Sequence, residues 1–454
     1  MTMTLTWRGG LAVLTALIAV MYASLLALAG NAGADRARTE TAGVEWGRAE
    51  ALPGIPAISG SSGHGQRVDF TAVSCWSVHN CAAVGDYGNR RFPFVVTELK
   101  GRWHWPEELP GIQALKATGT VSSVACARDG YCAAGGTYNT GQGRAFVVIR
   151  RWNHWRAVEE VPGMAALTTG SASVTSVSCP AENSCVVVGT YPGGTFASGQ
   201  TNGRWHAARQ LPGMGSVDTL SCWSAGNCLA GGSAVTSEVN GVWQTAEPVP
   251  GAAGAHISSV SCAPDGYCVV GGSDATQAFV ASWQDGVLGT AVTWPGSTVL
   301  AKGQTSQVVS VSCPAAASCT AAGNVVSVHG KRVLYYPAFV VSQASGVWGQ
   351  PEALPGAEAQ AEITSLSCPT AGVCGAGGRE VAVGGQLTEP FVVSKLNGRW
   401  TRPEAVPGIT ALNKKRDAWN GVAAVSCRSA AGRCAAVGTY TDAESRALPF
   451  VTAP

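Results

Sequence analysis

Sixteen cysteines are the residues whose type and spacing could carry chemistry most directly. Paired cysteines bind zinc, supply a nucleophile or join as disulfides. They form eight close pairs, and all but the last pair share one spacing. Zinc sites place cysteines closer together and add a second close pair or histidines, which is not the pattern here. The expected disulfides are Cys75–Cys81, Cys126–Cys132, Cys179–Cys185, Cys222–Cys228, Cys262–Cys268, Cys313–Cys319, Cys368–Cys374 and Cys427–Cys434.

Other groups capable of acid, base or metal chemistry show no catalytic spacing. No two histidines are spaced as H-x-x-x-H, and no serine lies in a G-x-S-x-G motif. The carboxylates of Asp129 and Asp265 fall in Asp-Gly turns, where a local hydrogen bond explains them. We therefore expect no catalytic residue, no metal and no cofactor. The histidines are His64, His79, His104, His154, His206, His256 and His329.

A set of tyrosines and arginines is the main candidate for binding. Each tyrosine lies two residues after a glycine that ends an apolar segment, in GDYGN, GTYNT, GTYPG and GTYTD. Phenol rings and planar guanidinium groups can stack on sugar rings or anchor a protein partner. The alternative is that each tyrosine covers the end of a neighbouring sheet. The candidate residues are Tyr87, Tyr138, Tyr191, Tyr440, Arg90, Arg91, Arg144 and Arg446.

These residues recur because the chain is built from one repeated unit. Each copy has a β-like stretch that ends in a cysteine, such as ITSLSC, then a turn and a second stretch, such as CVVVG. A third stretch, such as PFVVSKL, leads into a two-residue turn, and pairs such as Asn202-Gly203 favour a tight hairpin there. The fourth stretch begins with tryptophan, or with Leu288 in the fifth copy, and ends in Pro-Gly.

Four antiparallel strands in eight copies predict an all-β fold, an eight-bladed β-propeller of four-stranded antiparallel blades. The last copy stops after its third strand, LPFVTAP, whereas VEWGRAEALPG near the start is an unpaired fourth strand with Trp46. We expect this N-terminal strand to complete the last blade, because closure removes exposed sheet edges. The stretch NVVSVHGKRVLYY from Asn324 predicts a hairpin insertion in blade six.

An apolar segment at residues 11–29 follows Arg8 and precedes small residues, as in an export signal. We expect residues 1–34 to be a signal peptide or an N-terminal membrane anchor, 35–43 a linker, and 44–454 the propeller. Either outcome places the propeller outside the cytoplasm, secreted or attached through residues 11–29 to the outer face of the cytoplasmic membrane. Disulfides are permitted there.

Charge narrows the class of partner. Lysine and arginine number 30 against 28 aspartates and glutamates, a net charge of +2, and only 13% of residues are charged. This balance does not provide the basic surface that nucleic acid requires, so we expect no nucleic-acid partner. We expect a monomer that binds a protein or a cell-envelope glycan.

A glycine pair that ends the second strand, with a tryptophan further on, resembles the kelch repeat of galactose-oxidase-like β-propellers. SVSCPAENSCVVVG is also similar to units of exported bacterial propeller-like proteins with paired cysteines, which implies an envelope location and no particular activity. The copper ligands of galactose oxidase match no motif here, so its oxidase activity does not transfer. The glycine pairs are Gly135-Gly136, Gly231-Gly232, Gly271-Gly272 and Gly377-Gly378.

Loop lengths indicate where a partner would bind. Connections between strands two and three, and between blades, vary widely in length and share one face of a propeller. The leading hypothesis is an extracytoplasmic, non-catalytic binding or scaffolding propeller that recognises a glycan or protein through this variable-loop face. One alternative is a secreted carbohydrate-active hydrolase or lyase whose carboxylates converge at the central channel. Another is a structural component of an envelope assembly.

Overall fold

The computed structural model describes residues 44–52, 54, 68–88, 91–112, 115, 117–274, 277–294, 305–329, 332–335, 338–356, 361–381, 388–415, 420–429 and 432–453. They all belong to one compact unit, Val44–Pro454. The predicted leader, the linker, His64 and Arg90 lie outside the described residues. No helix in the described part of the chain has the length and apolar character needed to cross a bilayer.

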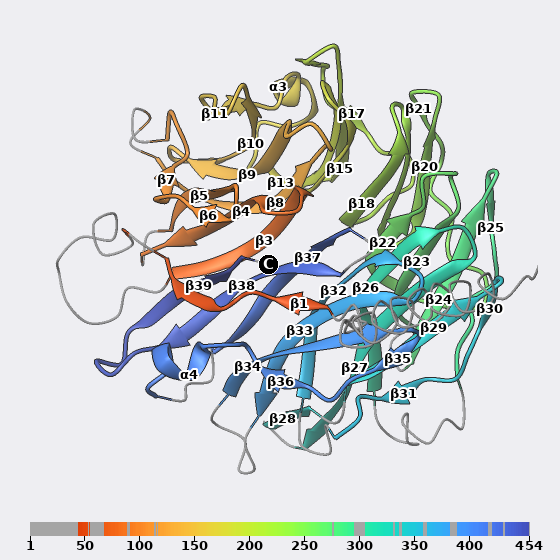
Figure 1. Cartoon of the computed structure of the whole chain (residues 1–454). Coiled ribbons are helices and arrows are strands. Elements are labelled where there is room, and N and C mark those ends of the chain that lie inside the picture. The colour runs from red at the N-terminus through yellow and green to blue at the C-terminus, as the bar shows by residue number, and fades with distance from the viewer. Residues whose placement is uncertain are drawn as a thin grey trace, which may run out of the picture. The chain divides into compact units, whose positions relative to one another are not determined.

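Each repeat forms one antiparallel sheet, and the eight sheets are the blades of a β-propeller (Figure 1). The first strand of each blade is innermost. Each inner strand contacts the inner strand of the next blade, and the last contacts the first, so the ring is closed. In blade order the inner strands are β3 (Val68–Ser77), β8 (Thr118–Cys126), β13 (Ser173–Ala181), β18 (Val217–Ser224), β22 (His256–Cys262), β26 (Thr305–Ala315), β32 (Ala361–Thr370) and β37 (Gly421–Arg428).

The second and third strands form the middle of each blade. The second strands are β4 (Asn80–Tyr87), β9 (Cys132–Asn139), β14 (Ser184–Tyr191), β19 (Asn227–Gly232), β23 (Cys268–Ser273), β27 (Ser318–His329), β33 (Val373–Val381) and β38 (Arg433–Thr441). The third strands are β5 (Phe92–Leu99), β10 (Gly143–Arg151), β15 (Gly194–Thr201), β20 (Val235–Val239), β24 (Ala278–Gln284), β29 (Phe339–Ala344), β34 (Thr388–Leu396) and β39 (Ala447–Thr452). The predicted insertion in blade 6 is β27 paired with β28 (Arg332–Tyr335).

The outer edge of each blade consists of short strands. The tryptophan-bearing strands are β6 (Arg102–Trp103), β11 (His154–Trp155), β16 (Arg204–Trp205), β21 (Val242–Trp243), β30 (Val347–Trp348) and β35 (Arg399–Trp400), with β25 (Val287–Leu288) in blade 5. Further along the same edge, paired with the same third strands, lie β7 (Glu107–Glu108), β12 (Glu159–Glu160), β17 (Arg209–Gln210), β31 (Glu352–Ala353) and β36 (Glu404–Ala405). Two one-turn helices, α3 (Met164–Leu167) and α4 (Ile409–Leu412), follow the Pro-Gly turns of blades 2 and 7.

The two ends of the propeller segment share blade 8, as predicted. β2 (Ala49–Ala51) pairs antiparallel with β39, and β1 (Glu45–Trp46) pairs parallel with β38. In Figure 1 the red N-terminal strands lie beside the blue C-terminal ones. The Ala49 N–H of blade 8 also donates to the Pro407 carbonyl of blade 7. In the same way, the Ala208 N–H of blade 3 donates to the Pro162 carbonyl of blade 2. Bonds of this kind join the Pro-Gly turns of blades 1, 2, 3, 4 and 7 to the outer edge of the next blade.

All eight predicted disulfides are present, each inside one blade between the inner strand and the second strand. The register places the two cysteines of a pair opposite each other, as in Cys126↔Cys132. The predicted two-residue turns also form. Asn202 and Gly203 have φ of 52° and 77°, as a hairpin with two left-handed residues requires.

A ring of hydrogen bonds joins the inner strands. The serine before the first cysteine of a blade accepts a hydrogen bond at its Oγ from the backbone N–H of the first cysteine in the next blade. This bond satisfies an N–H on an otherwise unpaired strand edge. The donors and acceptors are Cys75 to Ser426, Cys126 to Ser74, Cys222 to Ser178, Cys262 to Ser221, Cys313 to Ser261, Cys368 to Ser312 and Cys427 to Ser367, at 2.9 to 3.0 Å.

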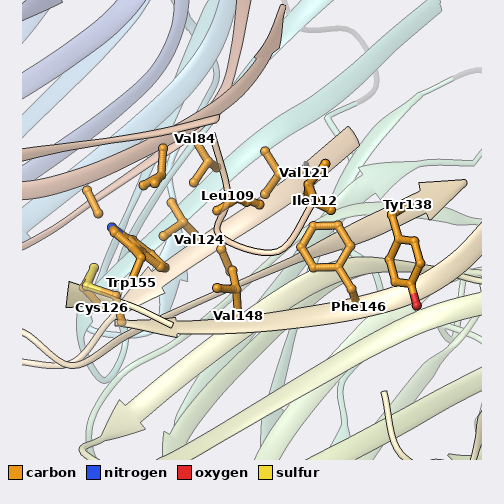
Figure 2. Packing of buried hydrophobic residues seen from close by; sticks show 14 of the residues in the cluster. Val84, Leu109, Ile112, Val121, Val124, Cys126, Tyr138, Phe146, Val148 and Trp155 are labelled. Atoms are coloured by element: carbon orange, nitrogen blue, oxygen red, sulfur yellow. A yellow bond between two sulfur atoms is a disulfide. The ribbon is translucent and has the colours of Figure 1, made fainter. Parts of the chain in front are cut away.

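Apolar side chains fill the spaces between blades. Figure 2 shows the cluster between blades 1 and 2, where Val84 and Leu109 meet Val121 and Phe146. A fully buried phenylalanine recurs on the third strand, opposite the glycine that ends the second. A Cβ at Gly189 would lie 2.6 Å from the Phe196 ring and 2.1 Å from the Ser173 carbonyl oxygen, so this position excludes any side chain. The recurrent glycine is thus a packing requirement.

Blade 2 provides a test of the serine ring because it carries Ala125 where the other blades carry serine. We predict that Ala125→Ser gives the Cys179 N–H a hydroxyl acceptor and raises the free energy of unfolding by about 1 kcal/mol. Ser178→Ala, which removes the acceptor for Cys222, should lower it by a similar amount. Denaturant unfolding of both variants measures this. A loss of stability in Ala125→Ser would contradict the assigned role.

The junction of blades 1 and 8 contains a buried carboxyl group. Glu98 lies on the face of β5 that also carries Phe94 and Val96, which pack against Val437 of blade 8. Its side chain is 0% exposed, and neither carboxyl oxygen has a hydrogen-bond partner among the described residues. Burial raises the pKa of Glu98 to about 7, because the charged form is poorly solvated there.

Stability should therefore depend on pH through Glu98. The folded chain keeps the Glu98 proton up to about pH 7 whereas the unfolded chain loses it near pH 4.5, so stability falls between these values and is then level. We predict that the unfolding free energy of Glu98→Gln, relative to wild type, rises by up to about 3 kcal/mol from pH 4.5 to 8. The exposed Glu107→Gln is the control. A difference that does not change with pH would refute the assignment.

Candidate functional site

The two faces of the propeller differ in their connections. The turns between strands one and two lie against the turns between strands three and four, and Gly203 N–H donates to the Asn183 carbonyl between them. We call this side the turn face. The second and third strands are joined at the opposite side, the loop face, together with the connections between blades. The predicted tyrosines stand at the loop-face ends of β4, β9, β14 and β38, and Arg91, Arg144 and Arg446 lie at or just before the starts of β5, β10 and β39.

The structure places the tyrosines largely in the core. Tyr87, Tyr138 and Tyr440 are 4%, 7% and 4% exposed, and Tyr191 is half-buried. In Figure 2 Tyr138 lies beside Phe146, with ring centroids 6.3 Å apart. The ring faces are occupied by the protein itself, which matches the alternative that tyrosines cover sheet ends. A role for these rings in binding stays a prediction.

Two of the phenol groups meet a carboxylate of their own blade. The Tyr87 hydroxyl donates to Glu108 Oε1, across from β4 on the short outer strand. Tyr138 is placed in the same way near Glu160. Burial, with a further contribution from the carboxylate, raises the pKa of both tyrosines above the ordinary value. The phenols are therefore neutral donors at physiological pH.

Three of the predicted arginines lie on the same face and remain accessible. Arg91, Arg144 and Arg446 are 63%, 46% and 50% exposed. Each is paired with a carboxylate of its own blade. Arg144 Nη1 lies 2.9 Å from Glu160 Oε1, and Arg91 Nη1 lies 3.6 Å from Asp86. Arg446 contacts Asp442 and Glu444, and its hydrogen bonds lower the pKa of Asp442 against the effect of burial.

A preformed cavity lies beside the Arg144–Glu160 pair. It has a volume of about 250 Å³, and its wall includes both side chains, the helix residue Met164 and the loop residues Thr168 and Gly170. A guanidinium group has five N–H donors, so pairing with one carboxylate leaves donors for a ligand. The structure thus brings a tyrosine, an arginine and a carboxylate together in blades 1, 2 and 8, with a cavity at blade 2.

One acid–base pair lies on the inner strands. Asp218 of β18 and His256 of β22 approach with Oδ2 and Nδ1 3.8 Å apart, and burial raises the pKa of Asp218. This pair is the structural feature most relevant to the enzymatic alternative. Within the described residues, no group of three or more His, Cys, Asp or Glu side chains is placed to hold a metal ion.

Sequence reasoning missed the two carboxylates, and a glutamine at the equivalent place, on the outer strands next to the tyrosines. In register, Glu108, Glu160 and Gln210 face Phe94, Phe146 and Phe196 and occupy one position on the outer strand. In the sequence these residues stand two places before the proline of the Pro-Gly pair, and only in the copies that carry Tyr87, Tyr138 and Tyr191. Aligning the eight copies with one another would have shown that these polar residues occur together with the tyrosines.

Comparisons with known proteins give structural likenesses only. No family model and no curated protein matches the chain. Solved structures similar to it include YCF48 bound to a D1 peptide, at 11% identity over 90% of this chain and 97% of that chain, with a TM-score of 0.43. An ulvan lyase of polysaccharide lyase family PL25 has 11% identity, 85% and 94% coverage and a TM-score of 0.44. The WD40 repeats of RRP9 have 13% identity over 73% of this chain and 91% of that chain, with a TM-score of 0.44.

The burial of the tyrosines predicts how loop-face variants will behave. Tyr138→Ala should lower the free energy of unfolding by about 3 kcal/mol, because it removes a core ring from the cluster of Figure 2. Arg144→Gln should change it by less than about 1 kcal/mol, since an exposed ion pair contributes little. Thermal and denaturant unfolding measure both values. Equal effects would contradict the placement of Tyr138 in the core.

Proposed function

We propose that this protein is an exported, non-catalytic binding propeller that recognises a glycan or protein partner through the loop face of blades 8, 1 and 2. The observation that carries the proposal is the cavity beside Arg144 and Glu160, flanked on the same face by the exposed, carboxylate-oriented Arg91 and Arg446. A guanidinium held in place by a carboxylate loses little entropy on binding, so its remaining donors suit hydroxyl, carbonyl or carboxylate acceptors.

An extracytoplasmic location is part of the proposal. Eight disulfides are typical of an oxidising compartment, which is consistent with the export signal proposed for residues 1–34. The proposal also includes secretion or anchoring through residues 11–29 and kelch-like repeats, both of which rest on sequence motifs. It further includes a monomeric state.

The test is a glycan array and a pull-down of envelope proteins with the full chain. Arg144→Gln combined with Arg446→Gln is expected to weaken binding at least tenfold, because each lost charge-assisted hydrogen bond costs about 1.5 to 3 kcal/mol. Arg204→Gln on the turn face is the matched control and should bind as wild type does. Unchanged binding by the folded double variant would exclude this surface.

The same incubations examine the enzymatic alternative, which Asp218 and His256 favour. Release of shortened or unsaturated sugars by wild type, together with its loss in Asp218→Asn, would replace the binding proposal with a carbohydrate-active enzyme. Intact glycans recovered after binding are the expected result.

A further inference from the structure

A second cavity lies between blades 3 and 4, away from the arginines of the loop face. Its volume is about 270 Å³. One wall comes from β14 and β15 of blade 3, and the other from β20 and β21 of blade 4. Gly226 and Gly241, which lie in the turns of blade 4, also line it, so the cavity is on the turn-face side.

Gly199 leaves this space open. Other blades carry a side chain at the corresponding position of the third strand, and in two of them its hydroxyl accepts a hydrogen bond from the tryptophan of the next blade, Trp155 to Thr97 and Trp46 to Ser394. A Cβ added at Gly199 would have no heavy atom within 4 Å. Trp243, the tryptophan that would meet residue 199, lines the cavity instead and is half-buried.

Glu238 contributes an unsatisfied carboxyl group to the same cavity. The residue is 6% exposed, lines the cavity, and its Oε2 has no hydrogen-bond partner among the described residues. Arg150 occupies the corresponding position in blade 2, but there the guanidinium donates to the Gly130 carbonyl and to Asn153. Glu98 of blade 1, at the same position, also lacks hydrogen bonds, but it is fully enclosed, whereas Glu238 lines a cavity.

The electrostatics of Glu238 indicate what is missing. Burial alone raises the pKa of Glu238, with no contribution from a neighbouring cation. Arg209 also lines the cavity, but its side chain is exposed, where water screens its charge. A buried carboxylate without a counter-charge is costly, so a cation that enters the cavity would be stabilised by it.

The aromatic wall suits the same ligand. Trp243 is directly opposite Glu238 in the pairing of β20 and β21, so the indole and the carboxyl group are neighbours. An indole face attracts ammonium groups through its quadrupole and also packs against apolar or sugar C–H surfaces. The cavity volume is slightly below the usual range for drug-sized ligands, so the cavity suits a smaller molecule.

We propose that the cavity between blades 3 and 4 binds a small ligand with a primary ammonium group, which pairs with Glu238 while the rest of the ligand lies on Trp243. Both a short aliphatic amine and an amino sugar with a free ammonium group have this chemistry. The site is independent of the proposed loop-face function, because it shares no residue with the loop-face site.

The experiment is isothermal titration of the full chain at pH 8 with matched pairs of probes. One pair is 1,5-diaminopentane and pentane-1,5-diol, and the other is D-glucosamine and D-glucose. We expect at least one ammonium probe to bind at least tenfold more tightly than its neutral partner, as a charge-assisted hydrogen bond predicts. The pair that shows the difference distinguishes an amine from an amino sugar.

Two variants locate the binding. Glu238→Gln keeps the shape and removes the charge, and Gly199→Thr keeps the charge and fills the cavity as Thr97 does in blade 1. Each should weaken ammonium binding at least tenfold, whereas Arg144→Gln on the loop face should leave it unchanged. Absence of binding by both ammonium probes, equal binding of neutral partners, or full retention in either folded variant would overturn the proposal.

Discussion

The structure depends on satisfying the free edge of each inner strand. An inner strand is hydrogen-bonded to its blade on one side only, so its remaining N–H and C=O groups need other partners. Serine hydroxyls of the preceding blade supply them, and the bond from Cys75 to Ser426 joins blade 1 to blade 8 across a separation of 351 residues. Thr71 and Thr364 add bonds in the opposite direction, from hydroxyl to carbonyl of the next blade. Closure is therefore built into every junction as well as into the shared blade.

The same bonds explain how the disulfides and the ring cooperate. The N–H that reaches the neighbouring serine belongs to a half-cystine, so a bridge within one blade fixes the donor of a bond between blades. At the outer rim the carbonyl of the Pro-Gly turn performs a similar task at five junctions, as between Pro162 and Ala208. At these five junctions a blade is thus held to its neighbour at both its inner and its outer edge, and apolar clusters fill the space between blades.

Much of this architecture could be predicted from the sequence, because period, cysteine spacing and turn residues are local signals. The number of blades, the disulfide pairs, the paired turns and the shared eighth blade were all predicted, and the structure confirms them. Side-chain direction at the ends of strands is not local. Tyr138 was a candidate for binding because of its place after a glycine, yet whether its ring faces solvent or Phe146 depends on how blades 1 and 2 pack together. The recurring serines before the first cysteines could be seen in the sequence. Their role as hydrogen-bond acceptors could not be predicted, because it depends on how the inner strands of neighbouring blades align.

Repetition makes departures from the frame interpretable. Glu98 and Glu238 stand at the same position of the third strand, opposite the second cysteine of their blades. Both carboxyl oxygens of Glu98, and Oε2 of Glu238, have no hydrogen-bond partner among the described residues. Glu98 is fully enclosed, so its carboxyl group keeps a proton up to about pH 7, and stability falls as the pH rises towards that value. Glu238 faces a junction where glycine replaces a hydroxyl-bearing residue, and the resulting space lets another cation take the place of that proton. The neighbouring blade therefore decides the role of a glutamate at this position. Where its side chains enclose the carboxyl group, as at Glu98, the glutamate lowers stability, and where glycine leaves space, as at Glu238, it can bind a ligand.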